Sequence, residues 1–237
     1  MKRFYKDAAA SAAADGNYTV LLDGKVVKTP KRAMLTLPNL ALANAMAEEW
    51  RAQGEELKTE SMPLTRLAFA AIDAVTPERE QIARQILKYA HSDLLSYRAE
   101  NPPELVARQA RIWDPLLDWA AETYGARLKV DSGIRHVRQP AEAIAALEEA
   151  IARYDEFELA ALHTATTITG SLILALALAE EEATAEEAFA AATLDETFQA
   201  EKWGIDAEAE QRRQRLLSEL SAIERFLRLL EAFGEAA

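Results

Sequence analysis

The spacing of apolar residues changes near residue 38, from short alternating runs to long helical stripes. Two β-prone runs, at Tyr18–Leu22 and 25–28, flank the dipeptide Asp23-Gly24. Asp-Gly between two such runs is the strongest short-range signal for a β-hairpin, so we expect antiparallel strands here. Two further short strands are expected, at 3–5 and 34–37.

After residue 38, apolar residues recur every three or four positions, which predicts helices. The expected helices lie at 40–53, from Pro63, from Thr76, from Asn101, over 140–153 and from Asp206 onward. Thr76, Pro77 and Glu78 form a typical helix start, in which a hydroxyl caps the helix and proline takes the first position. Asp114-Pro115 predicts either a kink or a fresh helix start with Asp114 as its cap.

Three segments stand out from this helical pattern. Residues 125–139 are expected to be non-helical, with short strands at 127–130 and 134–137. Residues 159–179 carry no charge, but they include His163 and several threonines and lack an aromatic belt. We therefore interpret them as a buried central helix rather than a membrane span. The glutamate-rich stretch 180–187 is expected to be a solvated loop between helices.

These elements predict an α+β protein. A small mixed α/β N-terminal domain with antiparallel strands is expected over 1–60. A larger all-helical C-terminal domain follows over 61–237, interrupted by the non-helical stretch near 125–139. At 237 residues, the chain is long enough for two such domains with a substantial core.

Composition and charge narrow the class of protein. Lys and Arg total 27 against 39 Asp and Glu, so the net charge is −12. A nucleic-acid-binding protein usually presents a basic stripe to the phosphates, so no nucleic acid is expected as a partner. Cysteine is absent, which excludes disulfides and cysteine-ligated metals. The N-terminal residues have no apolar secretory core, and we expect a cytoplasmic protein that does not insert into the membrane.

The sequence offers no recognisable catalytic or cofactor site. Neither of the two glycine-rich nucleotide fingerprints occurs. The three histidines, His91, His136 and His163, are too far apart for metal-ligand spacing. We therefore predict no catalytic residues, no metal site and no cofactor.

The segment 193–210 carries the most informative polar pattern in the chain. Glu196, Gln199 and Trp203 lie at helical spacing, and Gly204 follows at once, where a positive φ would end the helix. Tryptophan beside polar groups is enriched in binding hot spots. The stripe therefore predicts a partner-binding surface, and its shared face with Phe189 suggests partial burial of Glu196.

Eight segments, in this order, suggest a family. They are RFYK at Arg3, LLDGKVVKTP at Leu21, LALANAMAEEWRAQ at Leu40, MPLTRLAFAAID at Met62, YAHSDLLSYRA at Tyr89, PPELVARQARIWDPLLDW at Pro102, GSLILALAL at Gly170 and DETFQAEKWGIDAEAE at Asp195. Together they resemble the assembly chaperones of the F(1) head of ATP synthase that attend the alpha subunit, the Atp-twelve family. The likeness extends over nearly the whole chain and is that of a bacterial member.

The resemblance implies a chaperone without enzymatic activity. It would bind newly made ATP synthase F(1) alpha subunit, protect it from aggregation and hold it for assembly with beta. It implies cytoplasmic localisation in bacteria and the mitochondrial matrix for eukaryotic relatives, with a protein that is monomeric when free. The family depends on an acidic residue near the C-terminal helices, for which Glu196 is the first choice and Asp206 and Glu208 are the alternatives.

Two other functions remain open from the sequence alone. The first is an enzyme with an interdomain pocket built from four residues: Asp93, Arg98, His163 and Glu196. The second is a helical adaptor for another protein, which would use the heptad-like leucine stripe from Leu216 to Leu230. Burial of that stripe would remove its binding surface.

Overall fold

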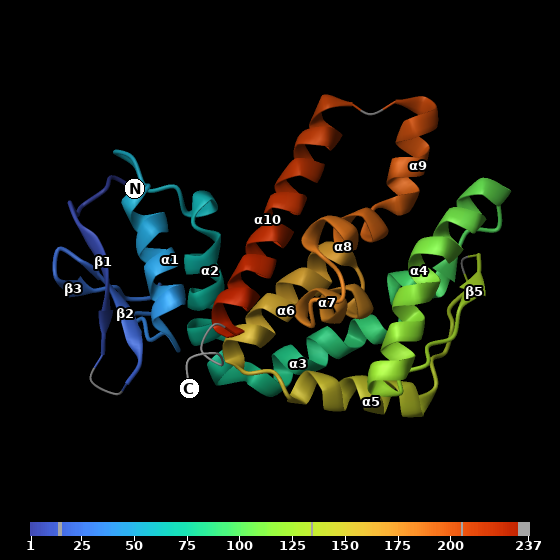
Figure 1. The fold of residues 1–237 in the computed structure, drawn as a ribbon, viewed down its shortest axis with the longest axis horizontal. Helices are drawn as coiled ribbons and strands as arrows, with labels where there is room; N and C mark the ends of the chain where they lie inside the picture. Colours follow the sequence, from blue (N-terminus) through green and yellow to red (C-terminus); the bar gives the residue numbers. More distant parts are fainter. Residues whose placement is uncertain (14–15, 134, 205, 232–237) are drawn as a thin grey trace. The chain divides into compact units, whose positions relative to one another are not determined.

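The computed structural model describes residues 1–13, 16–133, 135–204 and 206–231. The chain forms two compact units (Figure 1). The first comprises Met1–Arg79, Asp155–Ala161 and the chain from Ala222 onward, and the second comprises Glu80–Tyr154 and Leu162–Ser221. The first unit therefore combines the N-terminal part of the chain with helical segments that are distant in sequence.

The described elements include short strands and predominantly α-helices. The strands are β1 (Ala8–Ala12), β2 (Tyr18–Leu22), β3 (Lys25–Val26), β4 (Tyr97–Arg98) and β5 (Asp131–Ser132). The helices are α1 (Leu40–Arg51), α2 (Pro63–Ala70), α3 (Thr76–Ala90), α4 (Pro103–Tyr124), α5 (Ala141–Ala152), α6 (Glu156–Thr169), α7 (Leu172–Ala179), α8 (Ala185–Ala192), α9 (Leu194–Trp203) and α10 (Ala207–Glu231). The expected α+β class, with a small antiparallel sheet before a larger helical part, is confirmed.

The sheet of the first unit has the order β1-β2-β3, and all its pairs are antiparallel. The predicted turn joins β2 to β3, with φ of 47° at Asp23 and 77° at Gly24. Helix α1 packs on β1 and β2 and buries Leu42 and Met46. The alanine-rich strand β1 was not predicted, because alanine favours helix and gives no strand signal.

The other two strands expected near the N-terminus do not form. Met34 pairs with Lys28, and Leu37 pairs with Tyr18, but no continuous strand forms over 34–37. Residues 3–5 form no strand either. Instead the guanidinium of Arg3 donates to the Gln53 carbonyl at 2.6 Å, and its backbone N–H donates to Glu55. These contacts give the N-terminal segment partners outside the sheet.

Helix α3 begins at Thr76, as expected, but the capping role expected for Thr76 is wrong. The chain continues from α2 through a π-helical turn at Ala71–Val75 into α3, with Thr76 itself in helical geometry. Thr76 Oγ1 donates back to the Ala71 carbonyl at 3.0 Å. Pro77 has no N–H, and the ammonium of Lys31 donates to the Asp73 carbonyl one turn earlier, at 2.7 Å. This outside donor satisfies the carbonyl that Pro77 leaves free, and the helical path is kinked at the next residue, Glu78, with φ of −129° and ψ of 29°.

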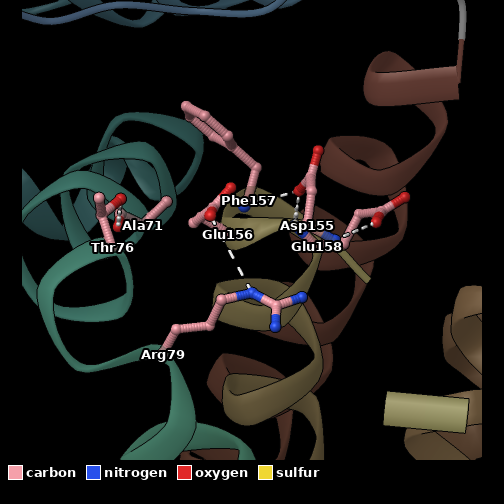
Figure 2. A network of polar contacts seen from close by, with 7 residues as sticks. All are labelled: Ala71, Thr76, Arg79, Asp155, Glu156, Phe157 and Glu158. Atoms are coloured by element: carbon pink, nitrogen blue, oxygen red, sulfur yellow. Dashed lines mark hydrogen bonds and ion pairs between the residues drawn. The ribbon is translucent and has the colours of Figure 1, made fainter. Parts of the chain in front are cut away.

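Helix α6 begins in the first unit with a reciprocal cap (Figure 2). Asp155 Oδ1 accepts from the backbone N–H groups of Phe157 and Glu158, at 2.8 and 2.9 Å. Glu158 Oε2 accepts from the Asp155 N–H at 2.7 Å, which completes a capping box. Arg79 lies 4.0 Å from Glu156 in the same network.

Glu49 on α1 caps the neighbouring helix α2. It accepts from the backbone N–H groups of Leu64 and Thr65 at 2.8 Å each, and from Thr65 Oγ1 at 2.7 Å. Burial raises the pKa of this carboxyl, and the bonds from Thr65 and Leu64 act against that rise. We expect Glu49→Ala to lower the free energy of unfolding by about 2 kcal/mol, since three donors lose their acceptor. Urea denaturation compares it with Glu55→Ala, an exposed control whose midpoint should stay near wild type.

Helix α7 forms the centre of the second unit. All eight of its residues are buried. The uncharged run 159–179 is divided between α6 and α7, because Gly170 with φ of 68° breaks it. The expected burial holds, but the single continuous helix does not. Among the described residues, no helix is long and apolar enough to cross a membrane.

Asp93 joins the start of α7 to the segment before β4. It is fully buried and accepts from Ser171 Oγ at 2.7 Å and from the Ile173 N–H at 3.2 Å. It also accepts from the Leu95 N–H at 3.0 Å. The Leu94 N–H donates to the Gly170 carbonyl. One carboxylate thus satisfies donors from two segments far apart in sequence.

Four further expectations need correction. The expected strand at 127–130 is absent, and the strand β5 at Asp131–Ser132 instead pairs in parallel with β4. The strand expected at 134–137 does not form at 135–137, and residue 134 lies outside the described residues. The loop expected at 180–187 ends at Thr184, which forms a capping box with Glu187 and starts α8. Helix α4 continues through Pro115, while Asp114 pairs with Arg98 at 2.7 Å.

Candidate functional site

Helix α9 presents the stripe that the sequence singled out. Leu194 and Phe198 are buried on its inner face, whereas Glu196, Gln199 and Trp203 are exposed. Spacings of three and four residues place these three side chains on one face of the helix. Gly204 follows with φ of 83° and ends α9, as the sequence predicted.

Contacts from α4 hold α9 at both ends. The buried Gln109 donates to Asp195 Oδ1 at 2.7 Å and accepts from the Ala99 N–H at 2.8 Å. Near the other end, Arg108 donates to Glu201 at 2.8 Å, and this bond lowers the pKa of Glu201. A helix fixed at both ends presents its outer face in one orientation.

A groove of about 630 Å³ lies between α9 and the first part of α10, the two helices that follow each other at the top of Figure 1. We call it the Trp203 groove. Its apolar lining includes Leu94, Ile168, Ala192, Ala200, Trp203 and Leu216. Its charged and polar lining includes Glu196, Gln199, Asp206, Arg212 and Arg213. Trp203 is 78 % exposed, although an aromatic side chain of this size is usually mostly buried.

Arg213 on α10, which lines this groove, contacts three side chains of α8 and α9. Its Nη2 donates to Thr197 Oγ1 at 3.0 Å, and its Nη1 lies 3.9 Å from Glu196 Oε2. The guanidinium also lies 5.5 Å from the centroid of the Phe189 ring. Because Glu196 is 70 % exposed and its ion pair is long, most of its negative charge faces solvent. The groove therefore joins an exposed indole to an accessible carboxylate.

Four of the five predicted partner-binding residues line this groove: Glu196, Gln199, Trp203 and Asp206. Asp206 also caps α10 by accepting from the Ala209 N–H at 2.8 Å. Glu208 is exposed in the first turn of α10 but is not part of the groove lining. The expected partial burial of Glu196 is wrong, since its side chain is mostly in solvent. The partner-binding role of all five residues stays a prediction.

Sequence reasoning named Asp206 but missed the contribution of Ala209, Arg213 and Leu216 on α10 to the groove. Asp206, Ala209, Arg213 and Leu216 all line it, and their spacings of three and four residues place them on one face of the helix. This pattern was visible in the sequence, but Leu216 was considered only as part of the leucine stripe from Leu216 to Leu230. The signal that could have revealed this face is a stripe of polar and small residues on α10 that continues into the apolar residue Leu216.

A second groove of about 530 Å³ lies on the other side of Arg213. It is lined by Arg108, Arg111, Phe189, Glu201, Arg213 and Leu217, among others. Arg213 thus separates the two grooves, and its contacts with Thr197 and Phe189 link α10 to α9 and α8. The described residues hold no cluster of acidic, histidine or cysteine side chains suited to a metal ion.

The four residues proposed for an enzymatic pocket have separate environments. Asp93 is bonded to Ser171, and Arg98 is held by the Leu95 carbonyl and Asp114. Burial lowers the pKa of His163, which is half-buried on α6. Of the four, Glu196 alone is in the lining of the Trp203 groove. The geometry thus gives these residues no shared reaction centre there.

The leucine stripe of α10 packs into the protein. Leu220, Ile223 and Leu227 are buried, and Leu216 and Leu230 are half-buried. The central positions of the stripe therefore have no surface to offer to a partner helix. The adaptor hypothesis loses the feature on which it rested.

The comparisons with known proteins identify the family. The sequence profile described as "ATP12 chaperone protein" matches residues 2–121, which is half of the chain. The chain belongs to the ATP12 chaperone family. This finding confirms the resemblance drawn from the sequence and, with it, a chaperone that acts in ATP synthase assembly. A curated ATP12 relative is the mitochondrial protein atp12 of Schizosaccharomyces pombe, 26 % identical over 215 residues, which are 86 % of this chain and 74 % of that protein.

Solved ATP12 structures share the whole fold. Atp12 from Paracoccus denitrificans is 41 % identical, with a TM-score of 0.91, and the match covers 97 % of this chain and 98 % of that one. An aspartate-to-lysine mutant of the same protein matches with the same identity and TM-score over 97 % of each chain. A protein from Agrobacterium tumefaciens is 46 % identical, with a TM-score of 0.93, over 97 % of this chain and 86 % of that chain.

Proposed function

We propose that this ATP12 chaperone binds the alpha subunit of the F(1) part of ATP synthase through the Trp203 groove. It holds the subunit for assembly with beta and prevents its aggregation. The observation that supports the proposal most directly is the pairing of a solvent-exposed Trp203 with the accessible carboxylates of Glu196 and Asp206. Glu208, exposed in the first turn of α10, is included in the proposed contact.

The physical properties of the groove suit the binding of a protein client. An exposed aromatic side chain supplies large apolar area at low entropic cost, and flanking charges supply specificity. The area offered by α9 is fixed by Gln109 and Arg108, so little ordering is needed on binding. The net charge of −12 opposes self-association of the chaperone, in agreement with a protein that is monomeric when free.

The proposed action is binding without catalysis. Release then follows from competition, in which beta covers the surface of alpha that the chaperone held. The bacterial relatives agree with a site of action in the bacterial cytoplasm, while the fission yeast relative is mitochondrial by its name.

The test is co-purification with the purified alpha subunit of the same organism. Wild-type chaperone should elute together with alpha in size-exclusion chromatography, and added beta should displace it. Glu196→Lys should weaken the capture of alpha by about tenfold, since it places a cation beside Arg213 and removes the accessible carboxylate.

The matched control is Glu122→Lys, which makes the same charge change at an exposed position of α4. Its capture of alpha should equal that of wild type. Recovery of no alpha subunit with wild-type chaperone would overturn the proposed function. Equal capture by Glu196→Lys and wild type would keep the client but remove Glu196 from its contact.

A further inference from the structure

The segment that joins α4 to α5 forms a second distinctive surface. Its residues alternate between buried and exposed: Ala126 and Leu128 are buried, while Arg127 and Lys129 are exposed. The side-chain amide of the buried Gln139 bonds both backbone polar groups of Lys129. Its Oε1 accepts from the Lys129 N–H at 2.7 Å, and its Nε2 donates to the Lys129 carbonyl at 3.1 Å. The side chain of Lys129 therefore projects from a backbone that Gln139 holds through both the N–H and the carbonyl group.

This surface is basic in an acidic protein. Between residues 127 and 138, four cations stand against the single acid Asp131, which gives a net charge of +3 where the whole chain carries −12. The cations are Arg127, Lys129, Arg135 and Arg138, and all are exposed. Within the described part of the chain, none of them forms an ion pair, whereas Arg98, Arg108 and Arg213 each do. In a chain with excess acid, these cations remain available to an outside anion.

A groove of about 540 Å³ adjoins two of these cations. Its lining includes His91, Lys129, Arg138, Pro140, Ile144 and Glu148. The cations Lys129 and Arg138 come from the basic segment, whereas Ile144 and Glu148 come from α5. A ligand would therefore meet positive charge on the side of the basic segment and apolar surface with one negative charge on the side of α5.

We propose that this basic face binds an acidic polypeptide segment of a partner protein. Carboxylates of that segment pair with Lys129 and Arg138. An aliphatic side chain of the segment packs on Ile144, because Glu148 beside it repels a carboxylate at that position. Nucleic acid fits less well, since Ile144 and Glu148 in the groove offer no contact to a continuous row of phosphates. The surface is separate from the Trp203 groove, and the inference does not depend on the identity of the client there.

The test is binding of a short fluorescent peptide in which glutamates alternate with leucines, followed by fluorescence anisotropy. Wild type should bind it, and added salt should weaken the binding. The double variant Lys129→Glu with Arg138→Glu should bind at least about tenfold more weakly, because two attractions become repulsions. Both side chains are exposed, and unchanged circular dichroism of the variant confirms that the fold is kept.

The matched control is Lys25→Glu with Lys28→Glu, which makes the same change in net charge at exposed positions of the first unit. It should bind the peptide as wild type does. The proposal is overturned by equal binding of a peptide with glutamine in place of glutamate, or by unchanged binding of the Lys129 and Arg138 variant. It is also overturned if a thymidine oligonucleotide binds this face more tightly than the peptide, or if the face instead joins two copies of this chain.

Discussion

Asp93→Ala is expected to lower the free energy of unfolding by about 3 kcal/mol at neutral pH. The substitution leaves Ser171 Oγ and the backbone N–H groups of Leu95 and Ile173 without their acceptor in a fully buried site. Each buried donor without a partner costs about 1–3 kcal/mol, and relief of the buried charge offsets part of that sum. Urea denaturation followed by circular dichroism measures the change.

The control for this prediction is Asp118→Ala, which removes a carboxylate from an exposed position of α4. Its unfolding midpoint should differ little from that of wild type. Ser171→Ala should fall between the two, because it removes one donor and leaves the backbone bonds to Asp93 in place. An Asp93→Ala midpoint equal to that of Asp118→Ala would show that Asp93 does not hold the start of α7.

The same carboxyl gives a pH dependence with a defined sign. Burial raises the pKa of Asp93 from 3.8 to about 6, against the opposing effect of the bond from Ser171. Between these values the folded protein keeps a proton that the unfolded chain has released. The part of the stability that depends on this bound proton is therefore present at about pH 4 and lost as the pH rises to about 6, whereas the hydrogen bonds from Ser171, Leu95 and Ile173 remain at neutral pH. Relative to Asp93→Asn, wild type should lose about 3 kcal/mol over this range, which denaturation at several pH values measures.

The elements with a strong local signal could be predicted from the sequence. The turn at Asp23-Gly24 is present because Gly24 tolerates the positive φ that it needs. Helices α2 and α5 begin at or just after the prolines that marked them, Pro63 and Pro140. In each case a few adjacent residues determine the backbone.

The failures have in common that a distant residue decides the outcome. Thr76 and Pro77 look like a capped helix start, but Thr76 continues a helical turn, and the ammonium of Lys31 bonds the carbonyl that the proline leaves free. Strand β1 consists mainly of alanines and exists because it pairs with β2 and packs against α1. The cap at Asp93 depends on Ser171 in the same way. Such partners cannot be read from local spacing.

In the candidate site, too, the features set by one helix could be predicted, and those set by contacts between helices could not. The face of α9 that carries Glu196, Gln199 and Trp203 followed from spacing within one helix. The role of Arg213 did not, because it arises where α10 meets α8 and α9. Exposure also depends on these neighbours, which is why the burial expected for Glu196 did not occur.

Trp203→Ala is expected to weaken the binding of the alpha subunit by about thirtyfold or more, equivalent to about 2 kcal/mol, if Trp203 is the anchor of the proposed contact. Its side chain is 78 % exposed, so the substitution removes little from the folded chaperone itself, and the unfolding midpoint should stay near wild type. Isothermal titration calorimetry with purified alpha measures the affinity, and Trp203→Phe should recover much of it by restoring aromatic area.

The matched control for Trp203 is Phe4→Ala, which removes an aromatic side chain that is 65 % exposed in the first unit. Loss of a general apolar surface would affect both variants alike, whereas a specific contact at the groove affects Trp203→Ala alone. Full affinity in Trp203→Ala together with weak binding in Phe4→Ala would place the client contact on the first unit instead. Because both side chains are mostly exposed, a change in affinity at an unchanged unfolding midpoint reports on the client and not on folding.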